Sequence, residues 1–222
     1  MSLLWDVRWL LLQATWTTAK LFVLASLLAV ALSLALGVAR ASNSRWLTWP
    51  SLVFGEVFRG VSLVVQLFWL FFVLPILGIS LSATTAAVLA LGLCFGAYGS
   101  EVVRTSLLAI PDGQRQAAYA LGLSRFKTLA YVELPQALVI MLPPMGNLLV
   151  LLLKSTSVTA LITVPELAFT ASALNSNVGA SFTVFGYVMA AYYLLGRCVL
   201  FGTNWLEQRL HVPGATTPKG AK

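Results

Sequence analysis

The sequence predicts an all-α, polytopic membrane protein with five transmembrane helices. Of its 222 residues, 59% are hydrophobic and 9% are charged, whereas a soluble domain carries about 25% charged residues. Uncharged apolar runs of about 20 residues, the length that spans a bilayer, recur along the chain. The net charge of +7 comes from basic residues that punctuate these runs. They read as topology signals rather than as a nucleic-acid-binding face, so no nucleic acid partner is expected.

The first apolar run covers residues 21–39. It is longer than the hydrophobic region of a cleaved signal peptide, which has about 7–15 residues, so we expect it to be retained as a span. Residues 1–16 contain three tryptophans with Asp6 and Arg8, which predicts an interfacial amphipathic helix. Residues 17–210 are expected to form the transmembrane domain. Residues 211–222, rich in Pro, Gly, Thr and Lys, are expected to form a disordered tail.

Four further spans follow the first. The uncharged stretch 60–100 is long enough for two of them, with Pro75 and Gly78 supplying the turn between them. Residues 134–153 form the fourth span. The fifth covers about residues 181–201, because the polar segment just before it interrupts the apolar run.

Lys and Arg are distributed unequally between the two sides of these spans. With the N-terminus outside, eleven of the 14 basic residues lie on the cytoplasmic side and three, Arg8, Lys20 and Lys154, lie outside. Because cytoplasmic loops carry the excess of basic residues, the predicted orientation is N-out and C-in.

The connection 105–133 is longer than a membrane turn requires. A turn at 111–113 offers Asp112 as the cap of a short helix over 114–121. Gly122 is placed to end that helix in a left-handed conformation. Ser124 is expected to cap a second helix, and Pro135 to mark the entry into the membrane. The sequence therefore predicts a protruding cytoplasmic coupling-helix loop.

This connection resembles a motif of a known family. Residues 116–118 read Q-A-A, Gly122 follows three residues later, and V-E-L-P at 132–135 follows after nine more. The pattern resembles the EAA loop of ABC importer permeases, which is E-A-A, three residues, G, nine residues and I-x-L-P. Gln116 replaces the glutamate of that motif, which removes a charge that could pair with a basic group of the ATPase.

Other segments extend the resemblance to the permeases for polar amino acids over about residues 14–210. They include G-A-Y at 96–98, E-V-V-R at 101–104, K-S-T-S at 154–157 and V-P-E-L at 164–167. The run 62–72 resembles the branch that takes up ectoine-type compatible solutes.

The resemblance implies a permease subunit of the bacterial inner membrane. Its expected partners are membrane lipid, an ABC ATPase dimer, a second permease that is identical or homologous, an extracytoplasmic solute-binding protein and a small polar solute. The chain lacks a G-x-x-x-x-G-K-[ST] loop, so ATP and Mg²⁺ are expected on the ATPase and no cofactor on this chain. The expected ATPase-coupling residues are Asp112, Gly113, Gln116, Ala117, Ala118 and Gly122.

Polar and aromatic groups of the spans are candidates for the substrate pathway or gate, because polar groups are costly to place in lipid. They are Gln66, Trp69, Glu101, Arg104, Asn147, Lys154, Thr156 and Ser157. Gln66 and Asn147 fit interhelical hydrogen bonds equally well. Glu101 and Arg104 also fit mutual pairing at a gate, and Lys154 could snorkel to the outer surface. Trp69 could hold a cationic solute by a cation–π contact.

Two alternatives to an ATP-driven importer are open at this point. One is a secondary transporter or channel that works without an ATPase, against which the structured cytoplasmic loop counts. The other is a membrane-embedded enzyme. With a single histidine, His211, and two separated cysteines, the chain offers no catalytic or metal-binding cluster, so no catalytic residue is expected.

Overall fold

The computed structural model describes residues 2–42 and 44–210, and the regular elements of these residues are helical. Within this part of the chain, four helices are long and apolar enough to cross a membrane. A bent pair of helices raises the number to five if it counts as one span. The predicted all-α, polytopic class is therefore confirmed. The expected disordered tail, with His211, lies outside the described residues.

Helix α1 runs without interruption over Ser2–Ala41. The predicted boundary at residue 16, between an interfacial helix and the first span, falls inside this single helix. Where the membrane begins along the helix stays a prediction. Glycine and proline are missing from the sequence up to Gly37, so nothing local ends the helix. At 1.5 Å per residue, a helix of 40 residues is about 60 Å long, roughly twice the hydrocarbon thickness.

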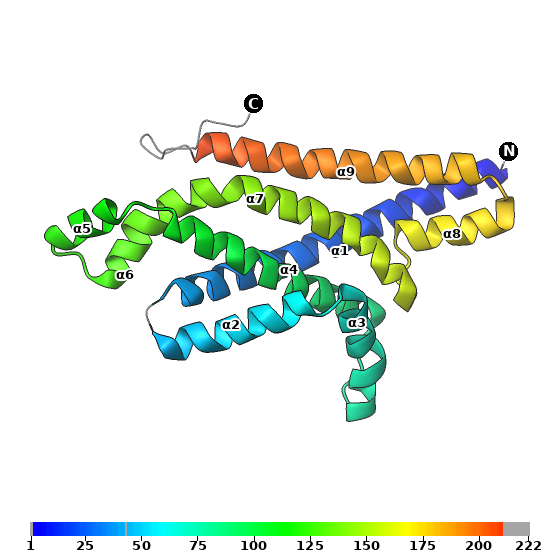
Figure 1. Cartoon of the computed structure of the whole chain (residues 1–222). Helices are drawn as coiled ribbons and strands as arrows, with labels where there is room; N and C mark the ends of the chain where they lie inside the picture. The colour runs from blue at the N-terminus through cyan, green and yellow to red at the C-terminus, as the bar shows by residue number, and fades with distance from the viewer. Residues whose placement is uncertain (1, 43, 211–222) are drawn as a thin grey trace.

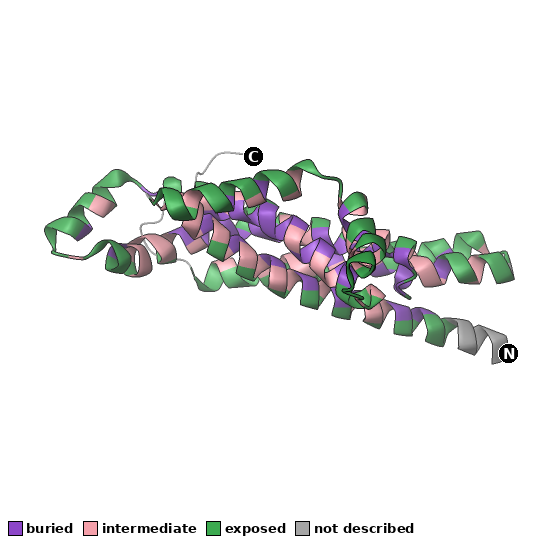
Figure 2. Ribbon diagram, turned by 90° about the horizontal axis from the view of Figure 1, so that it is seen from below, coloured by how far each residue is buried: buried purple, intermediate pink, exposed green. Residues whose placement is uncertain are grey.

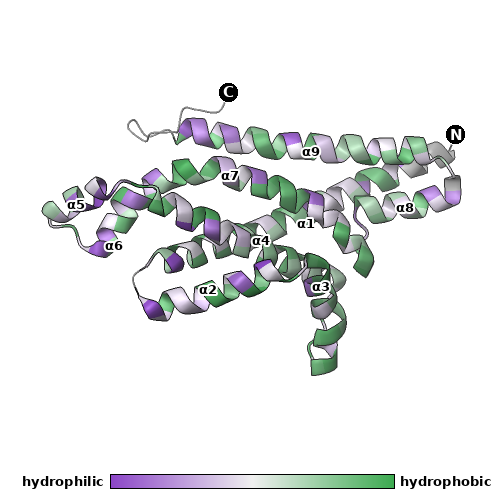
Figure 3. Ribbon diagram, in the orientation of Figure 1, coloured by the Kyte–Doolittle hydropathy of each residue, from purple (hydrophilic) through white to green (hydrophobic). Residues whose placement is uncertain are grey.

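The second span differs from the expected helix that starts at residue 60. Helix α2 covers Arg45–Gly60, and the chain then bends by 102° into α3 (Leu63–Phe68), a π-helical turn η1 (Trp69–Val73) and a 3₁₀ turn η2 (Leu74–Leu77). In Figure 1, α3 leaves the direction shared by the long helices, and Figure 3 shows that this segment is largely hydrophobic. Gly78 ends it with φ +88°, as the sequence predicts for the turn.

Helix α4 covers Ala83–Leu108 and begins at Ser82, whose hydroxyl accepts a hydrogen bond from the Thr85 amide at 3.2 Å. The helix continues eight residues past the predicted end at residue 100, so Glu101 and Arg104 lie within its last turns.

After α4, the short helices α5 (Asp112–Ala120) and α6 (Arg125–Thr128) lead into α7 (Leu134–Ser155) through a π-helical turn, η3 (Leu129–Glu133). Pro135, which was expected to mark the entry into the membrane, lies inside one continuous helical segment, Arg125–Ile162, that includes α6, η3 and α7. Proline lacks an N–H and clashes with the carbonyl four residues earlier, and a π turn relieves this locally. The turn η1 lies in the same place before Pro75.

The described part of the chain ends with η4 (Thr156–Ile162), α8 (Leu167–Val178) and α9 (Ser181–Arg209). Helices α1, α4, α7 and α9 run side by side as a bundle (Figure 1). Helices α5 and α6 lie at one end of this bundle, and α8 lies with the N-terminal part of α1 at the other end.

Helices α1 and α4 pack closely because three glycines of α4 face α1, where they lie against Leu28, Leu32 and Ser33. A Cβ atom on Gly96 would lie 2.8 Å from Leu32 Cβ, and one on Gly99 would collide with the Ser33 hydroxyl. Small residues allow helix backbones to approach closely where lipid supplies no hydrophobic drive for association. The buried residues run along the middle of the bundle (Figure 2).

Candidate functional site

The connection between α4 and α7 forms a knob, which we define as residues 109–133 with helices α5 and α6. Helix α5 begins at Asp112 because Pro111 occupies the N-cap position. The expected capping role of Asp112 is wrong: its side chain makes no capping hydrogen bond and pairs with Arg115 at 3.2 Å. An aspartate in the first turn still complements the positive end of the helix dipole.

Gly122 ends α5 with φ +75°, which confirms the predicted left-handed stop. Its N–H donates to the Tyr119 carbonyl at 2.9 Å, and the N–H of Leu123 donates to the Ala118 carbonyl at 3.1 Å. These two bonds make a Schellman motif, which turns the chain sharply and satisfies carbonyls at the helix end. Ser124 takes the predicted N-cap position of α6 but makes no side-chain capping bond.

Arg115 ties the knob to the bundle, a role that the sequence analysis did not assign to it. Its Nε donates to Glu133 Oε1 at 2.7 Å, and one Nη donates to the Leu107 carbonyl at 3.1 Å. The Glu133 side chain is only 13% exposed. One guanidinium therefore connects α4, α5 and η3. The residues lie 18 positions apart along the chain, so sequence spacing alone did not indicate the pair.

The knob presents a mixed polar and apolar surface, and in Figure 2 it is largely exposed. Its most exposed apolar side chains are Leu121 and Phe126, at 82% and 78%. Ala118 is buried and packs within its own chain, so its side chain does not reach a partner surface. The other expected coupling residues are exposed: Asp112, Gly113, Gln116, Ala117 and Gly122.

A cluster of charged residues joins α1, α2 and α4, with Glu101 at its centre. Glu101 Oε1 lies 2.9 Å from Arg104 Nη1, which confirms the predicted pairing. Its Oε2 lies 2.8 Å from Arg40 and 3.6 Å from Arg59. Arg59 also pairs with Glu56. Arg40 and Arg59 come from separate helices, so spacing along the sequence did not indicate that they belong to this cluster.

Gln66 lies at the bend between α2 and α3, and its side chain is buried. Its amide nitrogen donates to the carbonyls of Phe58 at 2.8 Å and Val61 at 2.9 Å. The bend leaves these carbonyls without helical partners, and Gln66 supplies the missing donors. The sequence left open whether Gln66 makes hydrogen bonds between helices or contacts the solute. The structure shows hydrogen bonds, and their acceptors are backbone carbonyls at the bend.

Helix α7 has an exposed face on which Pro143, Asn147, Leu151 and Lys154 recur at helical spacing. The opposite face packs on α4 and α9; a Cβ atom on Gly146, for example, would lie 2.7 Å from the Thr203 hydroxyl. The amide of Asn147 therefore points away from its own bundle. Polar groups within membrane spans ordinarily face protein or a water-filled path rather than lipid.

The remaining pathway candidates do not gather at one site. Trp69 is 48% exposed on η1, and the Ser157 hydroxyl donates to the Lys154 carbonyl at 2.8 Å. Thr156 is buried, where its hydroxyl donates to the Leu153 carbonyl at 2.7 Å and lies 3.4 Å from the Tyr192 hydroxyl. Among the described residues, no group of three His, Cys, Asp or Glu side chains could hold a metal ion.

Glu166 is a fully buried carboxyl that the sequence analysis did not select as a site residue. It caps α8 by accepting hydrogen bonds from the amides of Ala168 at 2.9 Å and Phe169 at 2.7 Å. It also accepts one from the Tyr192 hydroxyl of α9 at 2.9 Å. Burial raises the pKa of this carboxyl, against the opposing effect of these donors. Its isolation was an available signal, since it is the one charged residue between Lys154 and Arg197.

Comparisons with known proteins agree with this architecture. Residues 10–212 match the family described as binding-protein-dependent transport system inner membrane components. The chain is 37% identical to a probable amino-acid ABC transporter permease protein, y4tF, of Sinorhizobium fredii, over 88% of this chain and 84% of that protein. It is 33% identical to the glutamine transport system permease protein GlnP of Escherichia coli, over 95% of this chain and 97% of that protein.

Solved structures resemble the whole fold. A crystal structure of an amino acid ABC transporter with histidines superposes with a TM-score of 0.83 at 27% identity, over 93% of this chain and 96% of that one. A subunit of the inward-facing MetNI methionine ABC transporter has a TM-score of 0.78 at 20% identity and supports the fold alone. The chain therefore belongs to the family of inner membrane components of binding-protein-dependent transport systems.

Proposed function

We propose that this chain is the permease subunit of an ATP-driven, binding-protein-dependent importer of polar amino acids or related small solutes. The knob is the observation that carries the proposal. It is an exposed helix, ended by a left-handed glycine corner and tied to the bundle through Arg115, and it offers a rigid surface for a partner. Relatives that cover most of the chain are named as amino-acid permeases, which supports the solute class.

In this proposal an ABC ATPase dimer, which binds ATP and Mg²⁺, grips the knob. Movement of the ATPase is transmitted to the bundle as a rigid-body rotation. The exposed residues Asp112, Gln116 and Ala117 would contact the ATPase. Gly122 sets the corner that aims them. Because Arg115 bonds to Leu107 and Glu133, the knob and the ends of α4 and α7 would move together.

A second permease, identical or homologous, would complete the solute pathway. Asn147 lies on a face of α7 that its own bundle leaves uncovered, and α3 leaves the bundle at the 102° bend. One chain therefore makes half a site. In the predicted orientation, with the N-terminus outside, Lys154 lies near the outer mouth, where the binding protein would deliver solute. Two relatives from one organism, y4tF and y4tG, are both named as permeases, which fits a paired arrangement.

The test is solute uptake into proteoliposomes that hold this chain with its ATPase, with ATP trapped inside and the binding protein outside. A panel of radiolabelled polar amino acids and ectoine is supplied externally. We expect accumulation of at least one polar amino acid only with ATP. The ectoine branch rests on residues 62–72 alone, and this panel tests it directly. Equal transport without ATP or without the ATPase would contradict the importer and favour a secondary transporter or channel.

A further inference from the structure

The segment between η4 and α8 is an elbow, which we define as residues 163–166. Thr163 has φ +60° and ψ +23°. Within residues 2–42 and 44–210 it is the only residue other than glycine with a positive φ. A β-branched side chain in the left-handed region costs conformational free energy, and such a residue persists only where its surroundings enforce it.

The rest of the elbow is equally constrained. The N–H of Glu166 donates to the Val164 carbonyl at 2.7 Å, which closes a tight turn around Pro165. Val164 and Glu166 are buried, whereas Thr163 and Pro165 are exposed. The exposed Thr163 side chain therefore gains no packing that would offset its conformation, and the buried residues on either side must hold it.

The Glu166 carboxyl is the main polar contact that holds the elbow. It bonds to two amides of α8 and to the Tyr192 hydroxyl of α9. The amide of Leu167 donates to the Thr18 hydroxyl of α1 at 3.0 Å. We call the contacts of Glu166, Leu167, Thr18 and Tyr192 the latch. The latch joins α1, α8 and α9 at a place where the backbone itself is strained.

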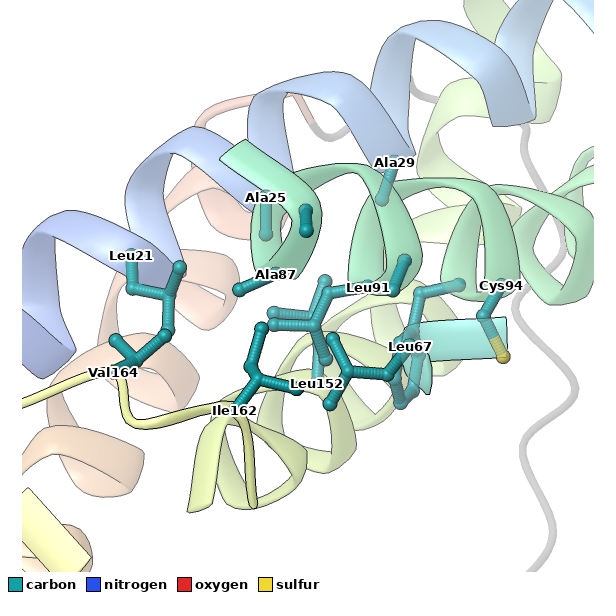
Figure 4. Close-up of a cluster of buried hydrophobic side chains, with 13 residues drawn as sticks. Leu21, Ala25, Ala29, Leu67, Ala87, Leu91, Cys94, Leu152, Ile162 and Val164 are labelled. Atoms are coloured by element: carbon teal, nitrogen blue, oxygen red, sulfur yellow. The ribbon is translucent and has the colours of Figure 1, made fainter. Parts of the chain in front are cut away.

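The turn η4, which leads directly into the elbow, packs against α3, the segment that follows the bend between α2 and α3. Ile162 of η4 lies near Leu152 and Leu67 in one buried cluster, and Val164 of the elbow joins this cluster beside Leu21 of α1 (Figure 4). Joints that absorb backbone rotation are where hinge motions of packed helices concentrate. A movement of α2 and α3 at the bend would reach the elbow through these side chains.

We propose that Glu166 is a positioning residue for transport, whose latch holds the strained elbow in one of two conformations between which the permease alternates. The proposal rests on the import function proposed above. In the latched conformation Thr163 is left-handed and α8 is fixed to α9. In the released conformation Thr163 adopts an ordinary right-handed or extended conformation and α8 separates from Tyr192. The free energy stored at Thr163 lowers the cost of release.

The substitution Thr163→Gly tests the proposal, because glycine adopts positive φ without the Cβ penalty. The substitution therefore stabilises the latched conformation relative to the released one. We expect a higher apparent unfolding temperature and an uptake rate at saturating solute that falls about tenfold, equivalent to about 1.4 kcal/mol. Thr163→Ala is the matched control, since it removes the hydroxyl and methyl groups but keeps the Cβ atom. It should transport at the wild-type rate.

A second variant weakens the latch from the opposite side. Tyr192→Phe deletes the hydroxyl that donates to Glu166. The double variant with Thr163→Gly should take up solute at least about threefold faster than Thr163→Gly alone, because the two changes shift the same equilibrium in opposite directions. A purely structural latch predicts no such rescue, since loss of the Tyr192 hydroxyl would then only destabilise the protein and would not raise the uptake rate.

All variants are measured as the reconstituted transporter with its ATPase and binding protein, using the polar amino acid that the wild type accumulates. Any one of three results would overturn the role of the elbow and leave the import function standing. They are a Thr163→Gly variant as fast as the wild type, a Thr163→Ala variant as slow as Thr163→Gly, and a double variant without rescue. A wild-type complex without ATP-dependent uptake would overturn the import function and the elbow together.

Discussion

The two connections that flank α7 both turn on a left-handed residue, and they differ in how that residue is stabilised. In the knob, before α7, the residue is Gly122, for which a φ of +75° carries no Cβ penalty. In the elbow, after α7, it is Thr163, for which the same region costs about 1–2 kcal/mol. The knob turn is therefore determined by its own sequence, whereas the elbow turn is imposed by its neighbours.

Their polar contacts differ in the same way. The knob is tied by ion pairs of Arg115 with Asp112 and Glu133 at a partly exposed surface. The elbow is tied by Glu166, a buried carboxyl whose donors are neutral. Exposed ion pairs contribute little to stability, whereas breaking a buried hydrogen-bonded group is costly. The knob is therefore suited to be a contact surface and the elbow to be an internal joint.

The largest expected effect is on the knob. Gly122→Val places a β-branched side chain at positive φ and removes the corner that aims α5, so we expect ATP-dependent uptake to be lost while membrane insertion is normal. Uptake into proteoliposomes at matched protein levels measures this. Gly186→Ala is the control, because Gly186 lies within α9, away from the knob, with open space around it, and it should transport normally. Normal uptake by Gly122→Val would remove the knob from the mechanism.

Next in size is the loss of the buried carboxyl of the elbow. Glu166→Ala leaves two amides and the Tyr192 hydroxyl without their acceptor, and we expect a loss of about 3 kcal/mol in the free energy of unfolding. Thermal unfolding of the purified protein measures it. Ser172→Ala, at an exposed position of the same helix, should change stability by less than about 0.5 kcal/mol. Equal effects of the two substitutions would show that burial of Glu166 is not what holds the elbow.

A smaller effect is expected from the ion pairs of the knob. Arg115→Ala removes the bonds to Glu133 and Leu107, and should cost about 1–2 kcal/mol because Glu133 is largely buried. Faster amide hydrogen exchange in α5 would locate the effect. Asp112→Ala is the matched control, since the Asp112 side chain is 81% exposed, and should cost less than about 0.5 kcal/mol. A larger loss from Asp112→Ala would reverse the ranking of buried and exposed contacts.

The smallest effect concerns pH. Burial raises the pKa of Glu166, which lies between the spanning helices, above that of a carboxyl in the unfolded chain. The folded state therefore retains this proton at higher pH than the unfolded state does. Stability from this group is present at low pH and is lost as pH rises through the raised pKa. We expect unfolding temperatures of the wild type to fall over this interval and those of Glu166→Gln to lack this component. Identical pH profiles for the wild type and Glu166→Gln would show that the pH dependence comes from other groups.

Features that depend on local chemistry were predictable from the sequence. Gly78 and Gly122 were expected at turns, and both have the positive φ that glycine permits. The pairing of Glu101 with Arg104 followed from their spacing on one helix. The apolar runs located the long helices, although most ends were misplaced, since helices continue wherever nothing local stops them.

Features that join distant segments were not predictable. Arg40 and Arg59 reach Glu101 from two other helices, and Gln66 donates hydrogen bonds to carbonyls on the far side of the bend. The bend between α2 and α3 exists because buried neighbours and the Gln66 amide compensate the broken helical bonds. A single sequence contains no record of such compensation, because the partners lie far apart along the chain.

The sequence by itself determined that the chain crosses the membrane several times, where the knob lies and how Gly122 turns it, because apolar length and glycine conformation act locally. The tertiary structure alone decided that Thr163 is left-handed, that Glu166 is buried against Tyr192 and that Asn147 faces away from its bundle. These depend on which helices pack together, and packing can enforce a backbone conformation that the residue would not adopt alone.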